Sequence, residues 1–276
     1  MDSVQLGTWA EMPSAYVTNV MARAGFDFSI IDMEHGVIDF NLAQDMVFAA
    51  HAAGKQAYVR VPAIEESWVT RTLDTGCDGI VFPQVKGLAD AKEAIRLCCF
   101  APEGERGFNP FVPAGGYHKV SADYFEKENR RIQIALILEG TEAFSQLDEI
   151  LKLPQISVLY IGQYDLSIAL GIPGDVTNQK VLDLMALTAR KASAAGKSAG
   201  CMVHSSGEAK DVIAQGFSFV VYKVDCGILY DCIHGFVEGV TGAGGNADRA
   251  KGEAEANTGI CGANKGAQTS AEAGND

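Results

Sequence analysis

Short apolar runs alternate with amphipathic stretches along the first 240 residues of the chain, and this alternation limits its fold more than any other feature. The runs have the length of strands, and the stretches between them have helical periodicity. Apolar strands separated by helices are typical of a parallel sheet that is buried on both faces. The predicted strands are residues 6–10, 28–32, 56–61, 79–85, 133–139, 158–162, 199–203 and 217–224.

Eight strand–helix units in about 240 residues fit a closed barrel better than an open sheet. The rival fold is a doubly wound sheet, but no Gly-x-Gly-x-x-Gly motif follows the first strand. We therefore predict an α/β fold, a single (β/α)8 TIM barrel over residues 1–240. The predicted helices are residues 14–24, 41–53 (with Asn41 as N-cap), 65–75, 88–99, 121–129, 141–151, 178–195, 206–215 and 226–238.

The character of the sequence changes after residue 240. Residues 241–276 contain no aromatic residue and only one isoleucine. Such a segment cannot bury enough apolar surface to offset the entropy lost on ordering. We predict a disordered tail, rich in glycine and alanine, that the chemistry does not need.

Composition excludes several classes of partner. The formal net charge of −13 would repel a phosphate backbone, so no nucleic-acid partner is expected. The seven cysteines have no spacing typical of a zinc site or a disulfide framework, which indicates reduced thiols and a cytoplasmic location. We find neither a secretory signal nor an apolar run of about 18 residues, so no membrane partner is expected.

Polar side chains gather where two predicted strands end, which is where barrels of this kind carry their functional groups. The strand 28–32 runs into Asp32-Met33-Glu34-His35, and Arg60 lies at the end of the next strand. An arginine in an apolar strand needs a partner, either substrate oxygens or a structural salt bridge to Asp32 or Glu34. His35, beside acids, is a candidate general base, although a lone histidine is more often structural.

Glu139 and Asp165 are carboxylates at the tops of neighbouring strands. Two buried carboxylates repel each other unless a cation lies between them. Two carboxylates plus waters are a typical arrangement for Mg²⁺, and Mn²⁺ is also suited. The alternative is two separate acids bonded to helix N-termini. Lys223, in the last strand, is the residue to check for a rival mechanism through a Schiff base.

Several motifs occur in order along residues 5–240, and together they resemble the HpcH/HpaI family of class II pyruvate aldolases. That family includes 4-hydroxy-2-oxoheptanedioate and 2-keto-3-deoxy-sugar-acid aldolases. The motifs are Gly25-Phe26-Asp27-Phe28, Asp32-Met33-Glu34-His35, Val59-Arg60-Val61-Pro62, Pro102-Glu103-Gly104-Glu105-Arg106-Gly107, Leu138-Glu139, Ile161-Gly162-Gln163-Tyr164-Asp165-Leu166-Ser167 and Val224-Asp225.

The resemblance implies a barrel of the phosphoenolpyruvate/pyruvate type and a divalent-metal-dependent lyase. Its reaction would be reversible cleavage of a 4-hydroxy-2-oxo acid to pyruvate and an aldehyde through a metal-bound enolate. Glu139 and Asp165 match the ligands of Mg²⁺ or Mn²⁺, and Arg60 matches the arginine that stabilises the enolate. A Lewis acid and a fixed positive charge are what a developing enolate requires.

The same resemblance assigns further roles. His35, with Asp74 behind it, matches an acid–base dyad, although Asp74 taken alone is only an acid at a helix end. A symmetric homo-oligomer, often a hexamer or trimer of dimers, is also implied. The remaining matches are Gly162, Gln163 and Tyr164, in the loop that receives the substrate carboxylate, and Asp32 and Glu34, which support the site from behind.

The sequence departs from the family pattern at three positions, which leaves the substrate open. Ile137 replaces a common glutamine, and Gln163-Tyr164 replaces Pro-Ala. The long loop 100–119 is expected to be functional, and its segment Phe108-Asn109-Pro110-Phe111 is a candidate for the aldehyde side, from the same or a neighbouring subunit. Two alternatives stay open: a CoA-thioester or decarboxylating lyase, and a non-catalytic barrel that binds a partner.

Overall fold

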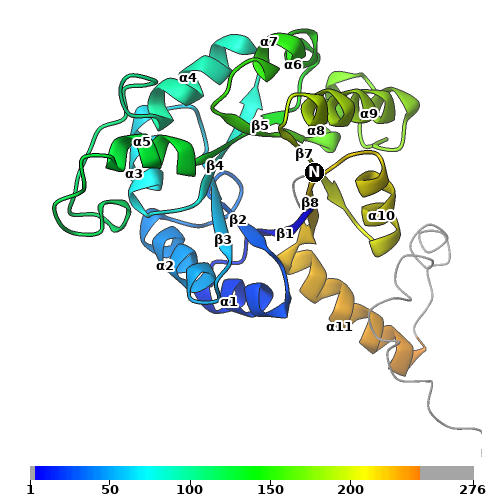
Figure 1. Ribbon diagram of the computed structural model, residues 1–276. Helices are drawn as coiled ribbons and strands as arrows, with labels where there is room; N and C mark the ends of the chain where they lie inside the picture. The colour runs from blue at the N-terminus through cyan, green and yellow to red at the C-terminus, as the bar shows by residue number, and fades with distance from the viewer. Residues whose placement is uncertain (1–3, 243–276) are drawn as a thin grey trace, which may run out of the picture.

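The chain folds into a closed barrel of eight parallel strands surrounded by helices, seen in a computed structural model that describes residues 4–242 (Figure 1). Each strand pairs with the next one in the sequence, and the last closes against the first. This confirms the predicted (β/α)8 barrel. The strands are β1 (Gln5–Ala10), β2 (Phe28–Asp32), β3 (Gln56–Arg60), β4 (Gly79–Val85), β5 (Gln133–Leu138), β6 (Ile156–Ile161), β7 (Ser198–Val203) and β8 (Phe219–Val224).

The helices largely follow the predicted pattern, with three differences. Asp39, not Asn41, caps the second helix, because its side chain accepts a hydrogen bond from Leu42 N at 2.9 Å. The predicted helix 141–151 is divided at Gln146, and neither the helix at 163–169 nor the short 3-10 helix at 113–115 was predicted. The helices are α1 (Ala15–Ala24), α2 (Phe40–His51), α3 (Glu66–Asp74), α4 (Leu88–Cys98), η1 (Pro113–Gly115), α5 (Tyr124–Arg131), α6 (Thr141–Ser145), α7 (Leu147–Leu151), α8 (Gln163–Ala169), α9 (Gln179–Ala194), α10 (Ser206–Ala214) and α11 (Asp225–Thr241).

Aromatic rings fill the inside of the barrel near the N-terminal ends of its strands. Phe28 stacks on Phe219 with ring centroids 4.0 Å apart, and Tyr58 meets both rings edge-on. All three side chains are almost fully buried. Gly7 on β1 makes this possible, since any Cβ at that position would overlap the Phe28 ring. The N-terminal end of the barrel is therefore closed by packed side chains.

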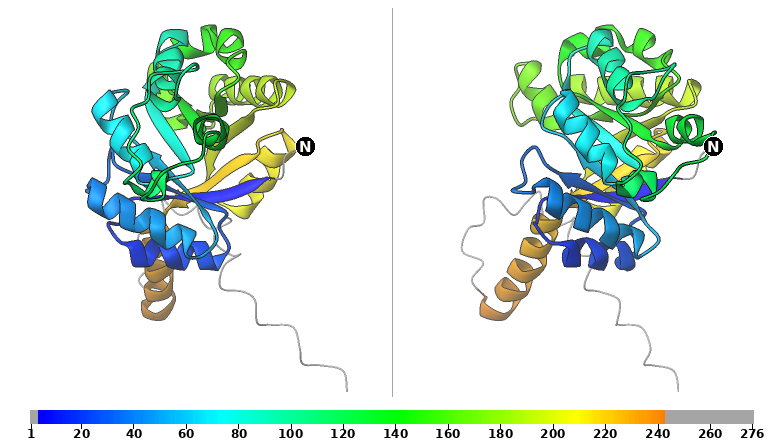
Figure 2. Two further views of the ribbon diagram at one scale, coloured as in Figure 1. Left: turned by 60° about the vertical axis from the view of Figure 1, so that its left-hand side comes forward. Right: turned by 90° about the vertical axis from the view of Figure 1, so that its left-hand side faces the viewer.

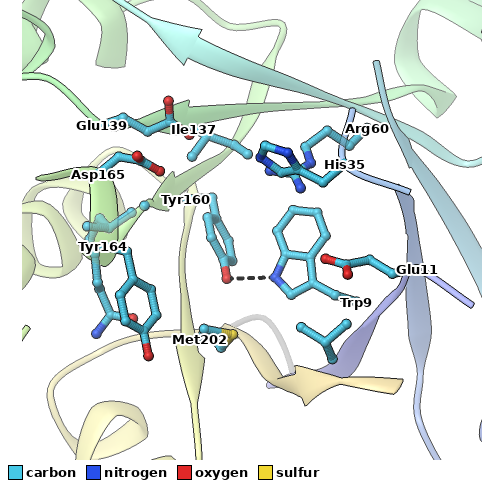
Figure 3. A pocket seen from close by; sticks show the side chains of 14 residues that line it. Trp9, Glu11, His35, Arg60, Ile137, Glu139, Tyr160, Tyr164, Asp165 and Met202 are labelled. Atoms are coloured by element: carbon cyan, nitrogen blue, oxygen red, sulfur yellow. Dashed lines mark hydrogen bonds between the residues drawn. The ribbon is translucent and has the colours of Figure 1, made fainter. Parts of the chain in front are cut away.

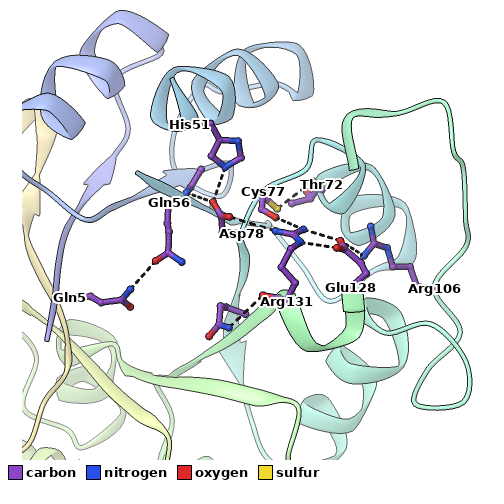
Figure 4. A network of polar contacts seen from close by, with 11 residues as sticks. Gln5, His51, Gln56, Thr72, Cys77, Asp78, Arg106, Glu128 and Arg131 are labelled. Carbon is purple, nitrogen blue, oxygen red and sulfur yellow. Dashed lines mark hydrogen bonds and ion pairs between the residues drawn. The ribbon is translucent and has the colours of Figure 1, made fainter. Parts of the chain in front are cut away.

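A network of ion pairs ties the outer layer together at the same N-terminal end (Figure 4). Asp78, which precedes β4, accepts hydrogen bonds from Ala57 N at 2.9 Å and pairs with His51 Nε2 at 2.8 Å. Arg131 bonds Glu128 at 2.7 Å and lies 3.6 Å from Asp78. These pairs join α2, α5 and the start of β4, which makes this end of the barrel a structural one.

The last helix, α11, does not lie along the barrel as the others do. Both Figure 1 and Figure 2 show it running away from the barrel beyond its first turns. Every residue after Asp231 in this helix is exposed. The exposed residues of α11 include six with large apolar side chains: Leu229, Tyr230, Ile233, Phe236, Val237 and Val240. Within the described residues, no helix is long and apolar enough to cross a bilayer. The predicted disordered tail was to begin at residue 241, but Thr241 still belongs to α11, and residues 243–276 lie outside the described part.

Candidate active site

Four of the polar residues predicted at the strand ends, His35, Arg60, Glu139 and Asp165, meet in one pocket at the C-terminal end of the barrel (Figure 3). The pocket has a volume of about 180 Å³. Seven of the eight strands, or the loops that directly follow them, contribute to it, as expected for a barrel of this class. Its lining is Trp9, Glu11, His35, Arg60, Ile137, Glu139, Tyr160, Ile161, Gly162, Gln163, Tyr164, Asp165, Met202 and Val224.

Arg60 is held rigidly at the base of this pocket. Its Nε donates to Asp32 Oδ1 at 2.9 Å, and its Nη2 donates to Asp32 Oδ2. Its Nη1 lies 3.1 Å from Glu34 Oε2, and the guanidinium packs over the Trp9 ring at 4.3 Å. The structural salt bridges considered from the sequence are therefore both present. They hold the guanidinium at the edge of the pocket, where it can still face a substrate oxygen.

Asp32 also shapes the turn that presents His35. Its buried carboxylate accepts hydrogen bonds from Glu34 N at 2.9 Å and His35 N at 3.3 Å. Glu34, in turn, accepts a hydrogen bond from Gln84 Nε2 at 3.2 Å. Asp32 and Glu34 thus position Arg60 and His35 rather than lining the pocket themselves. His35 is exposed to the pocket, where its ring can reach a bound molecule.

Glu139 and Asp165 face the same space in the pocket (Figure 3). The pKa of Glu139 is raised to about 7, first by burial and then by the negative charges of Asp165 and Glu34. A hydrogen bond from Gln84 N at 3.0 Å, made with a left-handed φ of 54° at Gln84, opposes this rise and fixes the carboxylate. The pair therefore carries an electrostatic repulsion that a cation would relieve.

The donor set suits a hard divalent ion. Oxygen ligands from two carboxylates are what Mg²⁺ and Mn²⁺ prefer, with waters and substrate oxygens completing the shell. Between residues 4 and 242, no group of three or more His, Cys, Asp or Glu side chains is arranged to hold a metal. A closed structural site is thus absent from that part of the chain, and an open site on Glu139 and Asp165 fits the residues present.

Gly162 leaves room for this carboxylate pair. A Cβ at position 162 would lie 2.7 Å from Glu139 Cγ and 3.2 Å from Ile137 Cγ2. Gln163 lines the pocket, but its side-chain amide points to Met185 Sδ at 3.4 Å. Tyr164 directs its hydroxyl to His204 Nε2 at 3.3 Å. Gly162 and Gln163 can therefore offer mainly backbone groups to a ligand, whereas Tyr164 can offer its side chain.

Asp74 lies at a helix end, as the sequence indicated, but it is not beside His35 as the family resemblance implied. It ends α3, which returns from the C-terminal end of β3 to the N-terminal end of β4, so it lies at the opposite end of the barrel from His35. Burial raises the pKa of Asp74, and the charge of Arg106 opposes this rise. One chain therefore does not form the predicted His35–Asp74 dyad, and such a pair would need Asp74 from a second copy.

The two other candidates from the sequence also lie outside the pocket. Lys223 has its Nζ 2.6 Å from Asp231 Oδ2 on α11, and no lysine lines this pocket in the described part of the chain. The loop 100–119 follows α4 at the N-terminal end of the barrel, where Phe108 packs on Phe125 with centroids 4.9 Å apart. Within one chain, this loop cannot shape the aldehyde side.

Sequence reasoning missed the lining formed by Trp9, Glu11, Tyr160 and Met202. Trp9 Nε1 donates to Tyr160 Oη at 3.1 Å, and the two rings meet edge-on across the barrel. Their positions could have identified two of them, since Trp9 and Tyr160 each lie one residue before the end of a strand. Glu11 follows β1 directly and was open to the same argument that identified Asp32.

Comparisons with known proteins agree with this geometry. Residues 5–231 match the family described as HpcH/HpaI aldolase/citrate lyase. A hydroxypyruvate/pyruvate aldolase of Rhizorhabdus wittichii is 30% identical over 81% of this chain and 89% of its own. A 5-keto-4-deoxy-D-glucarate aldolase of Shigella dysenteriae is 29% identical over 82% and 88%. The crystal structure of a Burkholderia cenocepacia protein of the same family superposes with a TM-score of 0.81, at 27% identity, over 87% of this chain and 95% of the other.

Proposed function

The chain belongs to the HpcH/HpaI aldolase/citrate lyase family, and on this premise we propose that it is a divalent-metal-dependent aldolase that reversibly releases pyruvate and an aldehyde from a 4-hydroxy-2-oxo acid. The family and its aldolase relatives support carbon–carbon lyase chemistry. The observation that carries the rest is the convergence of Glu139, Asp165, Arg60 and His35 on one pocket. Mg²⁺ or Mn²⁺ held by Glu139 and Asp165 would supply Lewis acidity to the oxo group.

Arg60 supplies the fixed positive charge in this proposal. Asp32 and Glu34 keep its guanidinium in place before any substrate arrives, so little reorganisation is needed as negative charge develops on the substrate oxygen. The Trp9 ring beneath it keeps the group at the pocket wall. The same residues thus hold the arginine structurally and aim it at the reacting atoms.

His35 moves the proton. Its ring faces the pocket from the turn after β2, and its backbone is fixed by Asp32. An imidazole can remove the proton of the 4-hydroxyl during cleavage and return a proton to the carbon of the enolate. The first-turn amides of α8, at Gln163 and Tyr164, are suited to the substrate carboxylate. No lysine is required for any of these steps.

Exchange of the pyruvate methyl protons for deuterium tests the proposal directly. NMR would follow the exchange with Mg²⁺, with Mn²⁺ and with EDTA. We expect exchange that depends on metal and that falls at least about 100-fold in His35→Ala or Arg60→Ala. A protein that neither exchanges these protons nor cleaves any 4-hydroxy-2-oxo acid with either metal is not such an aldolase.

The alternatives have separate tests. A CoA-thioester or decarboxylating lyase would turn over CoA substrates or release carbon dioxide without releasing an aldehyde. A non-catalytic barrel would keep its biological role after His35→Ala and Arg60→Ala. The convergence of His35 and Arg60 with the carboxylate pair favours the aldolase over both. The cytoplasmic location stays a prediction from the cysteine pattern.

We also propose that the enzyme is a homo-oligomer in which a second copy covers α11. Six exposed large apolar side chains on one helix form a patch of the kind that monomers rarely present to water. An assembly such as a hexamer built as a trimer of dimers would bury it. Such an assembly could also place Asp74 of one copy near His35 of another.

Sedimentation velocity would test this assembly. Phe236, which is 72% exposed on α11, is changed to Glu, and Leu182 on α9, 41% exposed, is changed to Glu as the matched control. We expect the α11 variant to dissociate to a smaller species and the α9 variant to sediment like the wild type. A wild-type protein that sediments as a monomer at micromolar concentration would disprove the proposal.

A further inference from the structure

The pocket has two chemically different halves (Figure 3). One half holds Glu139 and Asp165, with Arg60 and His35 beside them. The other half, below them in this view, is formed by Trp9, Tyr160 and Met202, with Glu11 and Tyr164 on opposite sides. In the proposed aldolase the pyruvate part occupies the first half, so the aldehyde-derived part faces the second.

Glu11 is the one acid of this second half. Its backbone N–H donates to Asp225 Oδ1 at 3.1 Å, which fixes the segment just after β1 and directs the side chain to the pocket. Arg60, whose charge acts on Glu11, is already paired with Asp32 and Glu34. Burial raises the pKa of Glu11, and the charge of Asp32 raises it further, against the opposing charge of Arg60. This region therefore disfavours negative charge, and a substrate carboxylate would meet the same environment.

Tyr164, across the pocket, presents a hydrogen-bond acceptor. Glu208 Oε2 lies 3.4 Å from His204 Nδ1 and also accepts from His204 N at 2.7 Å. This carboxylate favours the tautomer with its proton on Nδ1, so that Nε2 accepts the hydroxyl proton of Tyr164. The Tyr164 hydroxyl then donates its proton to His204, and the Tyr164 oxygen can accept a hydrogen bond from a ligand.

Glu11 and Tyr164 therefore each need a hydrogen-bond donor from the ligand, whereas the Tyr160 hydroxyl already accepts a hydrogen bond from Trp9 Nε1. A carboxylate on the substrate would offer none and would be repelled by Glu11, and a methyl group would leave the Tyr164 oxygen without a new partner. A hydroxyl group satisfies either residue. Trp9 and Met202 supply the apolar remainder of the wall.

We propose that the aldehyde handled by this enzyme is uncharged and carries a hydroxyl group, with Glu11 selecting against carboxylates and Tyr164, positioned by His204, selecting for the hydroxyl. This inference rests on the proposed aldolase function and narrows its substrate class. It separates the chain from a relative named for glucarate, a dicarboxylate. His204 acts through Tyr164 and is a positioning residue.

Condensation of pyruvate with acetaldehyde, glycolaldehyde and glyoxylate tests the proposal, because these aldehydes have the same carbon number and differ by a methyl, hydroxymethyl or carboxylate group. The readout is the ratio of kcat/KM values within each variant. We expect wild type to prefer glycolaldehyde to acetaldehyde by roughly three- to tenfold, the worth of one hydrogen bond, and to use glyoxylate least. Tyr164→Phe should bring the first ratio near unity.

Two further variants separate the roles. Glu11→Gln should raise the glyoxylate-to-acetaldehyde ratio about tenfold, since it removes the repulsion but keeps the shape. His204→Leu should lower the glycolaldehyde preference as Tyr164→Phe does, and the double variant should show no further loss. Tyr16→Phe, at an exposed tyrosine on α1, is the matched control and should keep every wild-type ratio.

The outcomes are distinguishable. If wild type exchanges pyruvate protons but Glu11→Gln or Tyr164→Phe has the same kcat/KM ratios as wild type, this inference is wrong and the proposed aldolase function stands. Wild type with neither exchange nor condensation overturns the proposed function, and the inference with it. Metal-dependent exchange together with both predicted shifts supports the two proposals.

Discussion

Gly162 and Glu139 are packed so closely that a Cβ at position 162 would lie 2.7 Å from Glu139 Cγ. The backbone that leads from β6 into α8 thus forms the wall against which one carboxylate of the proposed metal site rests. Gly162 N also donates to Leu138 O at 3.2 Å, which leaves this wall little freedom to withdraw.

Gly162→Ala should therefore displace Glu139 and weaken the binding of Mn²⁺ by at least about tenfold, a cost of about 1.4 kcal/mol or more. Isothermal titration calorimetry with the metal alone would measure this. Gly107→Ala is the matched control, because a Cβ at position 107 would meet nothing within 4 Å. Equal Mn²⁺ affinity in the two variants would show that Glu139 is not a ligand of the metal.

The raised pKa of Glu139 gives the metal-free protein a definite pH dependence. The carboxyl has a pKa of about 7 in the folded protein and 4.5 as its ordinary value, so the folded state binds its proton more tightly. Its contribution to stability is fully present below pH 4.5 and is lost as pH rises towards 7. In EDTA, wild type should lose melting temperature relative to Glu139→Gln across this window. Parallel melting curves for the two proteins would contradict the assignment.

Arg60 has a structural role in holding Asp32 and a proposed catalytic role, and two variants separate them. Arg60→Ala leaves Asp32, which is fully buried, without its cation, and should cost about 3–5 kcal/mol in urea unfolding. Arg60→Met with Asp32→Asn removes both charges and should recover much of that stability without restoring deuterium exchange. Recovery of exchange in the double variant would show that the guanidinium does not act on the substrate.

His35→Asn should abolish proton exchange while leaving Mn²⁺ affinity unchanged, because its ring faces the pocket and the proposed ligands are Glu139 and Asp165. NMR exchange and calorimetry on the same preparation would measure both quantities. His118→Asn, at an exposed histidine in the loop 100–119, serves as the control. A parallel loss of metal affinity would place His35 among the ligands.

A Schiff-base mechanism should be absent. Lys223 is paired with Asp231 at 2.6 Å and does not line the pocket. Borohydride added with pyruvate should therefore leave the activity intact, since there is no imine to reduce. Mass spectrometry would detect a pyruvate adduct on Lys223 if the rival mechanism operated.

The barrel could be predicted from the sequence because each strand is a short apolar run with its own boundaries. Every predicted strand is present, and its ends differ by at most two residues from the predicted ones. Because functional groups gather at strand ends, Asp32, Arg60 and Glu139 were predicted to lie close together. Arg60 and Glu139 line one pocket, and Asp32 binds Arg60. Helix α8 escaped prediction, because Gln163-Tyr164-Asp165 offers no apolar periodicity at the start of so short a helix.

Other features depend on three-dimensional relationships that spacing does not contain. Asp74 has the right residue type but ends a helix that runs to the far side of the barrel. Glu11 enters the pocket because Asp225, more than 200 residues later, binds its backbone. Helix α11 leaves the barrel after Asp231, which pairs with Lys223 on β8 and is the last residue of this helix that is not exposed.

The packed rings of Phe28, Tyr58 and Phe219 close the N-terminal end of the barrel, so the candidate active-site pocket opens at the C-terminal end. Two products that are bound in a pocket with one opening must leave one after the other, the one nearer the opening first. An aldolase built this way releases its two products in a fixed order. The product that leaves last then competes with the intact substrate for the empty enzyme, whereas the product that leaves first inhibits in a mixed pattern, so steady-state product inhibition reports which half of the pocket lies deeper.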